Sequence, residues 1–318
     1  MNDSTGLCYY EHMSALTPIS IEPLVVTELV EEYVEKLATT VRPDYLTALK
    51  AASVMEEDER GHHVLKQLLA NATMAAEEGL PTCQDTGYVW VCLEVSGDVL
   101  VPADIFAGVD AAVARASERG GLRKSIMRDA LIERVNTNTN TPTFCEVMLK
   151  RSITSNPLDS EEKELPLPPS ATLHIMLKGG GSDNASALAM LPPGAGIDGV
   201  LDFVEQAVSA KGANACPPLV VGVGVGSTFD KVAGLAKHAL LRTIGSGHPQ
   251  AEIAELEATL LARINALGIG PSGLGGSTTA LAVHIESAPA HIAALPVAVN
   301  LGCTAMRSVS LPLLAVSC

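Results

Sequence analysis

Apolar residues recur at helical spacing through the first quarter of the chain. In residues 21–40 they fall three or four positions apart, which is the pattern of an amphipathic helix. A second segment of this kind begins at Pro43, and a third runs from Asp58 to about Gly79. Proline suits the first turn of a helix and glycine suits its end. The sequence therefore predicts a helical N-terminal region over residues 1–80.

The pattern changes at Pro81, where short runs of Val, Ile and Leu begin to alternate with amphipathic segments. This alternation predicts an α/β (α+β) fold in which residues 81–318 form a mixed-sheet domain, compact with the helical cap. A stretch rich in Pro and Glu, residues 156–169, is expected to be a surface loop. The expected strands are 88–95, 144–150, 171–177, 219–225, 278–285 and 295–299, and the expected helices are 102–119, 197–210, 229–242 and 251–267.

Composition narrows the classes of function. The chain has 318 residues, is 47% hydrophobic and carries a formal net charge of −15. A chain this acidic is poorly suited to wrapping nucleic acid or lying on an anionic membrane. No apolar run approaches the roughly 18 residues of a membrane span, and residues 1–11 lack the basic and apolar parts of a secretory signal. We therefore expect a cytoplasmic protein that contacts neither nucleic acid nor membrane.

Seven cysteines are dispersed along the chain. An odd, scattered set in a cytoplasmic protein favours free thiols, buried thiols or metal ligands over disulfide bonds. The cysteines are Cys8, Cys83, Cys92, Cys145, Cys216, Cys303 and Cys318.

Polar residues gather in short Gly- or Pro-marked segments between the expected elements. Loops on a rigid scaffold are where functional sites are usually built. The segments are residues 81–87, 136–142, 178–184, 216–218, 270–279 and 303–307.

Two glycine-rich segments superficially suggest nucleotide binding. The glycines of residues 222–226 lie inside an expected strand and lack the G-x-G-x-x-G order, so we interpret them as a place of close backbone packing. The three glycines after Lys178 lack the order of a P-loop. A nucleotide-binding module therefore stays a weaker hypothesis.

Taken together, the ordered segments resemble the class I (iron–sulfur) fumarate hydratases and the α subunits of L(+)-tartrate dehydratase. The resemblance extends from about residue 21 to residue 307. It rests on Cys83-Gln84-Asp85-Thr86-Gly87, Leu122-Arg123 with Ser125, Asn140-Thr141-Pro142, Lys178-Gly179-Gly180-Gly181-Ser182, Cys216-Pro217-Pro218, and residues 268–279 followed by the strand at Leu295 and by Cys303.

The resemblance implies a [4Fe-4S] cluster held by Cys83, Cys216 and Cys303. Three ligands would leave one iron open as a Lewis acid, and the local C-x-x-C pattern of a four-cysteine electron carrier is absent from the sequence. Cys92 and Cys145 fall in expected strands and are interpreted as core residues.

The same resemblance implies water addition to, or removal from, a small dicarboxylate, either fumarate/malate or tartrate/oxaloacetate. Asp85 and His291 are the candidates for the catalytic acid, and Arg307 matches a family arginine. The residues expected to bind and orient substrate are Gln84, Thr86, Arg123 and Lys178.

The general base is missing from these motifs. In fused relatives a second domain follows and supplies candidate bases, so we expect a β-type subunit to complete the site in a homo- or hetero-oligomer. Asp183, Ser227 and Ser277 replace residues usual in the family, which bears on the choice of substrate.

Three other functions remain open at this point. They are a non-catalytic iron–sulfur or iron-sensing protein, a nucleotide-binding module and a zinc protein that uses the same cysteines. Asp85, Arg123 and His291 favour the enzyme, because a purely structural cluster does not need them.

Overall fold

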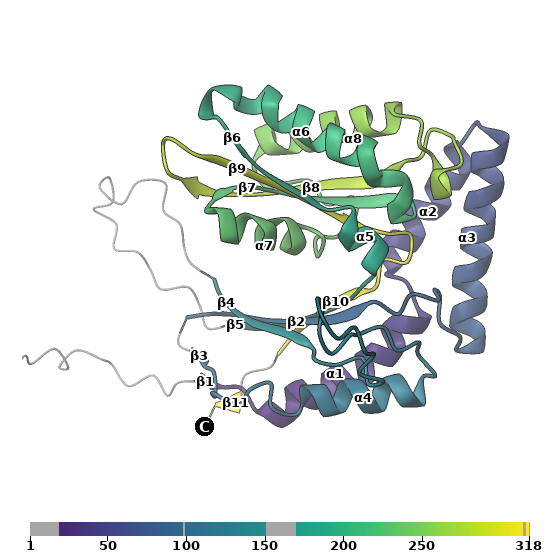
Figure 1. Cartoon of the computed structure of the whole chain (residues 1–318). Coiled ribbons are helices and arrows are strands. Elements are labelled where there is room, and N and C mark those ends of the chain that lie inside the picture. The colour runs from purple at the N-terminus through teal and green to yellow at the C-terminus, as the bar shows by residue number, and fades with distance from the viewer. Residues whose placement is uncertain (1–18, 98, 151–169, 314–315, 318) are drawn as a thin grey trace, which may run out of the picture.

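A computed structural model describes residues 19–97, 99–150, 170–313 and 316–317. Two four-stranded sheets lie one above the other, with helices on both outer faces and α7 (Phe229–Ala239) between them (Figure 1). The expected α/β fold with a helical N-terminal region is confirmed. The loop expected at residues 156–169 lies outside the described residues, as do Cys8 and Cys318.

The lower sheet in Figure 1 has the strand order β10-β5-β2-β4. Strand β2 pairs antiparallel with β5 and parallel with β4, and β10 pairs antiparallel with β5. Alternate residues of β2 point to opposite faces: Val91 packs in the core beneath the sheet, whereas Trp90 packs in the core between the sheets. The bounds are β2 Tyr88–Ser96, β4 Phe144–Leu149, β5 Ser170–Lys178 and β10 Ser308–Pro312.

The upper sheet has the order β6-β9-β7-β8, with β7 parallel to β8 and antiparallel to β9. Helices α6 and α8 cover its outer face, and α7 lies on its inner face (Figure 1). The bounds are β6 Ala187–Leu191, α6 Gly196–Lys211, β7 Leu219–Ser227, α7 Phe229–Ala239, α8 Ala251–Ala266, β8 Ala280–Ala290 and β9 Leu295–Gly302.

The N-terminal helices share hydrophobic cores with the sheets. Helix α1 packs with α4 under the lower sheet, while Tyr45 of α2 and Leu65 of α3 pack against residues of both sheets. Asp58 begins α3 by accepting a hydrogen bond from the Gly61 N–H (2.8 Å), and Gly79 ends it with a φ of 67°. The bounds are α1 Pro23–Thr39, α2 Pro43–Met55, α3 Glu59–Glu78 and α4 Val109–Arg119.

A few elements differ from the sequence-based expectations. The helix expected at residues 102–119 begins only at Val109, because the preceding residues form hydrogen-bonded turns. Edge strands β6 and β10 were not expected, and both are only five residues long. The remaining short elements are β1 Ile19–Ser20, β3 Val99–Leu100, α5 Gly180–Asn184 and β11 Val316–Ser317. No helix in the described ranges has the length and apolarity needed to cross a bilayer.

Helix α7 approaches β7 unusually closely. A Cβ atom added at Gly222 would lie 2.2 Å from the Ala236 carbonyl oxygen, and one at Gly224 would lie 2.4 Å from that of Val232. Both distances are far inside van der Waals contact, so only glycine fits at either position. The interpretation of these glycines as sites of close backbone packing is confirmed.

We predict that Gly224→Ala destabilises the protein by about 1–3 kcal/mol, because the added methyl group forces the helix away from the sheet. Gly234→Ala on the same helix is the matched control: its Cβ meets nothing within 4 Å, and alanine favours helix by up to about 1 kcal/mol. Urea unfolding of both variants measures the difference. Equal midpoints for the two variants would contradict the close-packing argument.

Candidate functional site

Three cysteines from widely separated segments line one cavity. Cys83 precedes β2, Cys216 precedes β7 and Cys303 follows β9, so all three lie at the same edge of the two sheets. The cavity has a volume of about 150 Å³, a size that can hold a small organic molecule. Helices α2 and α3 form its other wall through residues such as Leu49 and Leu68.

Hydrogen bonds tie the cysteine loops to one another and to the N-terminal helices. The Thr304 N–H donates to the Cys216 carbonyl (2.9 Å), which joins the loops of Cys216 and Cys303. The Tyr45 hydroxyl donates to the Pro218 carbonyl (3.0 Å), and the Thr82 N–H donates to the Ala38 carbonyl (2.9 Å). Each cysteine loop is therefore held in place by a hydrogen bond to or from its main chain.

Cys216 has a backbone conformation that few side chains adopt. Its φ is 56°, in the left-handed region that favours glycine. Burial raises the pKa of its thiol, and the neighbouring Cys303 and Cys83 raise it further. Crowded thiols resist ionisation unless a cation compensates the charge, and a bound metal does this. The donor set thus fits a metal cluster held by three thiolates.

The other described cysteines behave differently. Burial raises the pKa of Cys92 and of Cys145 to about 12. Cys92 is fully buried between the sheets, and Cys145 packs against the core under the lower sheet. The expectation of a core residue is confirmed for Cys92, whereas Cys145 is partly buried on the edge strand β4.

Asp85 also lines the cavity, and both oxygens of its carboxylate are held by main-chain donors. Oδ1 accepts a hydrogen bond from the Gly87 N–H (3.0 Å), and Oδ2 accepts one from the Gly180 N–H (2.8 Å). The Arg123 guanidinium lies 3.6 Å from Oδ1 and is half exposed. The carboxylate is therefore fixed in orientation beside the cysteines and faces a solvent-accessible cation.

Arg307 lines the same cavity and is only 1% exposed. Its Nη2 donates to the Asp85 carbonyl (2.9 Å), whereas its buried Nε and Nη1 have no hydrogen-bond partner among the described residues. Leaving buried donors of a charged group unpaired is costly. Arg307 therefore places a buried guanidinium beside the cavity, with two donor atoms that no described residue uses.

Lys178 is buried and uses its ammonium group internally. It donates to the Ser182 hydroxyl and to the Leu301 carbonyl, both at 2.9 Å, and lies 3.5 Å from Asp183. Burial lowers its pKa, which Asp183 and Cys303 partly offset. These contacts join the end of β5 to the end of β9, so Lys178 holds the two sheets together beside the cavity.

The remaining expected site residues lie in different places. Gln84 is exposed and Thr86 is buried, on either side of Asp85. His291 is exposed in the turn between β8 and β9, whereas Cys303 follows the other end of β9. An eight-residue strand spans about 25 Å. The structure therefore does not bring His291 near Asp85 within one chain.

Glu56 supports the site and was not anticipated from the sequence. Its carboxylate accepts hydrogen bonds from the N–H groups of Ser277 (2.9 Å) and Thr278 (2.9 Å) in the glycine-rich loop of residues 270–279. The same loop donates from the Ser272 N–H to the Pro217 carbonyl (2.8 Å), next to Cys216. Donors that could otherwise cradle a phosphate are thus engaged by an internal carboxylate. Glu56 and Ser277 lie 221 positions apart, so no local pattern could reveal the contact.

Comparison of the sequence with known proteins places the chain in an enzyme family. Residues 27–311 match the sequence model of the fumarate hydratase (fumerase) family, and the chain belongs to this family. It is 38% identical over 286 residues to a Methanocaldococcus jannaschii protein provisionally named L(+)-tartrate dehydratase subunit alpha, covering 89% of this chain and 95% of that protein. It is 32% identical over 282 residues to the L(+)-tartrate dehydratase subunit alpha of Escherichia coli K12, covering 89% and 88% respectively.

We predict that Glu56→Gln lowers the free energy of unfolding by about 2 kcal/mol near neutral pH, because hydrogen bonds to a charged acceptor are lost. The hydrogen bonds from the loop hold the pKa of Glu56 below its ordinary value despite burial. Its charged form therefore stabilises the fold above the unfolded-state pKa, and this contribution disappears as pH falls through the folded-state pKa. The gap between wild type and Glu56→Gln should be constant above about pH 5 and should shrink in more acidic solution.

Urea unfolding at several pH values measures this gap. The adjacent exposed Glu57→Gln is the control and should show little effect. A gap of the same size at pH 3 and pH 7 would contradict the assignment of the charge.

Proposed function

We propose that this chain is the cluster-binding subunit of a hydro-lyase that acts on a small dicarboxylate. The observation that carries the proposal is the meeting of Cys83, Cys216 and Cys303 around one cavity, beside Asp85 and the unpaired donors of Arg307. Membership of the fumarate hydratase family supports the reaction class.

The thiolates of Cys83, Cys216 and Cys303 would hold a [4Fe-4S] cluster. Such a cluster supplies an iron with an open coordination position, which acts as a Lewis acid toward oxygen atoms of the substrate. Hydrogen bonds to the main chain hold the three loops that carry these cysteines around the cavity.

Two arginines are suited to a dicarboxylate. The buried Arg307 lines the cavity and has two unpaired donors, and the half-exposed Arg123 lies 3.6 Å from Asp85. A guanidinium can bind a carboxylate with two parallel hydrogen bonds. We propose that these arginines bind the substrate carboxylates, that Gln84 and Thr86 orient the substrate, and that Lys178 acts mainly by positioning the β5–β9 junction.

Asp85 is the proposed acid within this chain. Its carboxyl group lies beside the cysteines, where it could donate a proton to the departing hydroxyl group. His291 lies at one end of β9, and the cysteine cavity of the same chain lies at the other end, about 25 Å away. His291 would therefore serve as an acid only if another copy of the chain brought it to the site.

The substrate is proposed from the relatives. Both are named as tartrate dehydratase subunits, which favours the tartrate/oxaloacetate pair. The family description favours fumarate/malate as the second candidate. Parallel turnover assays with L(+)-tartrate and with fumarate distinguish them.

The proposed partner is a β-type subunit that supplies the general base. The relatives are named as α subunits, and Asp85 is the one Asp, Glu or His side chain among the described residues that line the cavity.

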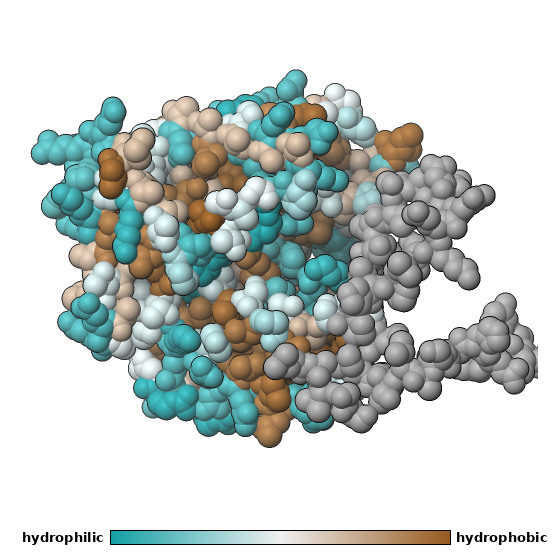
Figure 2. Space-filling view, turned by 180° about the vertical axis from the view of Figure 1, so that it is seen from behind, coloured by the Kyte–Doolittle hydropathy of each residue, from teal (hydrophilic) through white to brown (hydrophobic). Residues whose placement is uncertain are grey.

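The face of the molecule in Figure 2 mixes hydrophobic and hydrophilic side chains in small patches. The irregular segment that follows α4, however, exposes Leu131 (84%) and Ile132 (83%). Exposed apolar side chains of this kind are typical of an interface.

We predict that serine at Cys83, Cys216 or Cys303 prevents assembly of the cluster during anaerobic reconstitution with iron and sulfide. A cubane with one open iron needs all three thiolates, so each variant should lose the brown chromophore. Cys92→Ser is the control and should keep it, because Cys92 lies in the core away from the cavity. Iron and sulfide analysis with absorption spectra measures the outcome. Full loading of Cys216→Ser would refute the ligand assignment, and zinc in place of iron would favour a zinc protein.

We predict that the reconstituted chain alone turns over neither tartrate nor fumarate and becomes active when a β-type subunit is added. Leu131→Asp with Ile132→Asp should weaken the association at least about tenfold, because charges replace apolar contacts. Ile292→Asp, exposed at the opposite edge of the upper sheet, is the control. Titration of activity against the β subunit measures the affinity. Robust turnover by this chain alone would show that the partner is unnecessary.

A further inference from the structure

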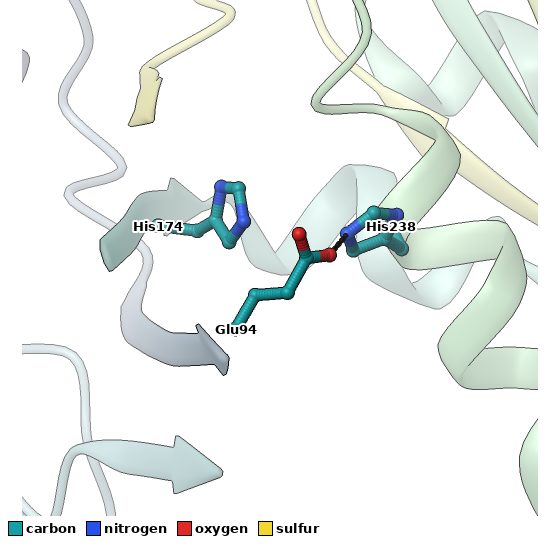
Figure 3. Close-up of side chains that lie close together, drawn as sticks. All are labelled: Glu94, His174 and His238. Carbon is teal, nitrogen blue, oxygen red and sulfur yellow. Dashed lines mark hydrogen bonds and ion pairs between the residues drawn. The ribbon is translucent and has the colours of Figure 1, made fainter. Parts of the chain in front are cut away.

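A second group of metal-binding side chains lies between the two sheets. Glu94 on β2, His174 on β5 and His238 on α7 point toward one another, with the carboxylate between the two imidazole rings (Figure 3). The three donor atoms lie within 4.8 Å of one another. His174 is directly opposite Cys92 on β2, so Glu94, two residues further along, shares its face of the sheet.

This group is separate from the cysteine cavity. His174 lies four residues before Lys178 on β5, which corresponds to roughly 13 Å along the strand. None of the three side chains lines that cavity. The inference therefore does not rest on the proposed function.

The hydrogen bonds within the group leave one buried ring nitrogen, Nε2 of His174, without a partner among the described residues. The His238 Nε2 lies 3.1 Å from one oxygen of Glu94, and the Lys150 ammonium lies 3.1 Å from the other. The His174 Nδ1 lies 2.8 Å from the Ser310 hydroxyl, while its Nε2 is buried with no partner in the described structure. His174 is only 6% exposed. A buried imidazole nitrogen without a partner is unfavourable unless a ligand occupies it.

Two of the three side chains, those of His174 and Glu94, have the protonation states that metal ligands need. Burial lowers the pKa of His174 to about 4, so its ring is neutral at physiological pH. If Nδ1–H donates to Ser310, the lone pair of Nε2 points into the group. The hydrogen bond from His238, with help from Lys150, lowers the pKa of Glu94 to about 2, so this carboxylate is charged.

We propose that Glu94, His174 and His238 form a second metal site, which takes a divalent first-row transition cation such as Zn²⁺. Two imidazoles and one carboxylate suit such ions, with water as the fourth ligand. Bonds of about 2.0–2.1 Å in a tetrahedral arrangement place donor atoms about 3.3 Å apart. The carboxylate and His238 already have nearly this spacing, and His174 lies within 4.8 Å of both.

The cation would join the two layers of the fold. Glu94 and His174 belong to the lower sheet, and His238 belongs to the helix that packs on the upper sheet. Binding to the folded state alone would raise the thermal unfolding midpoint.

Lys150 competes with the cation. Its ammonium occupies an oxygen of Glu94, but its side chain is 59% exposed and is free to turn into solvent. Lys150→Met should therefore tighten metal binding, because it frees the carboxylate and removes a repelling charge. An ordinary ion-pair network without a metal site predicts no such gain.

The test is calorimetric titration of Zn²⁺ into the full-length chain with Cys83, Cys216 and Cys303 replaced by serine. One equivalent should bind, and Glu94→Gln, His174→Ala and His238→Ala should each weaken binding by at least about 10–100-fold. Ser310→Ala should weaken it about 10-fold through the second hydrogen bond of His174. His63→Ala, an exposed histidine on α3, is the control and should leave the affinity unchanged.

Co²⁺ bound to the chain with its native cysteines gives a second readout. Co²⁺ at a thiolate site shows a sulfur-to-cobalt charge-transfer band. Co²⁺ at the proposed site shows only weak ligand-field bands. The ligand-field bands of the proposed site should vanish in His238→Ala. If His174→Ala fails to fold by circular dichroism, the partly exposed Glu94 and His238 variants decide the question. Absence of Zn²⁺ binding would overturn the proposal. So would Glu94→Gln and His238→Ala variants that bind Zn²⁺ as tightly as the parent chain.

Discussion

The spacing between the two sheets is the constraint on which the cysteine cavity depends. Cys83 leads into the lower sheet, whereas Cys216 and Cys303 flank strands of the upper sheet. The bond from the Thr304 N–H to the Cys216 carbonyl couples the two upper loops directly. Cys83, by contrast, is positioned through the N-terminal helices: the Thr82 N–H donates to the Ala38 carbonyl at the end of α1, and Asn71 of α3 donates to the Thr82 carbonyl. The N-terminal helices therefore belong to the site and do not merely cover it.

The chain as a whole is negatively charged, whereas positively charged side chains lie at the cavity. A net charge of −15 repels anions from most of the surface. Lys178 does little to reverse this locally, because Asp183 and two internal acceptors engage its ammonium. Arg307 differs, since it is buried with two unpaired donor atoms and no acidic partner among the described residues. The specific attraction for an anion thus depends chiefly on Arg307, with Arg123 beside Asp85.

The sequence predicted most of the regular elements because their apolar periodicity is local. It missed β6 and β10, two five-residue edge strands that depend on pairing with distant strands. The set of three cysteines followed from family resemblance and not from spacing, since their proximity is produced by the topology of two sheets. Glu56 and the group of Glu94, His174 and His238 carry no local signal, because each contact joins elements far apart in the chain.

Helix α7 sets the distance between the layers. Gly222 and Gly224 allow it to lie closely against β7, which fixes it to the upper sheet. From its other side, Lys237 donates to the Tyr88 hydroxyl (3.0 Å) at the start of β2, and His238 contacts Glu94 further along the same strand. Cys83 lies just before β2. A change in the position of α7 against β7 therefore shifts β2, and with it Cys83, relative to Cys216 and Cys303. Packing of two glycines and polar contacts at the end of one helix therefore control the geometry of a site that neither of them touches.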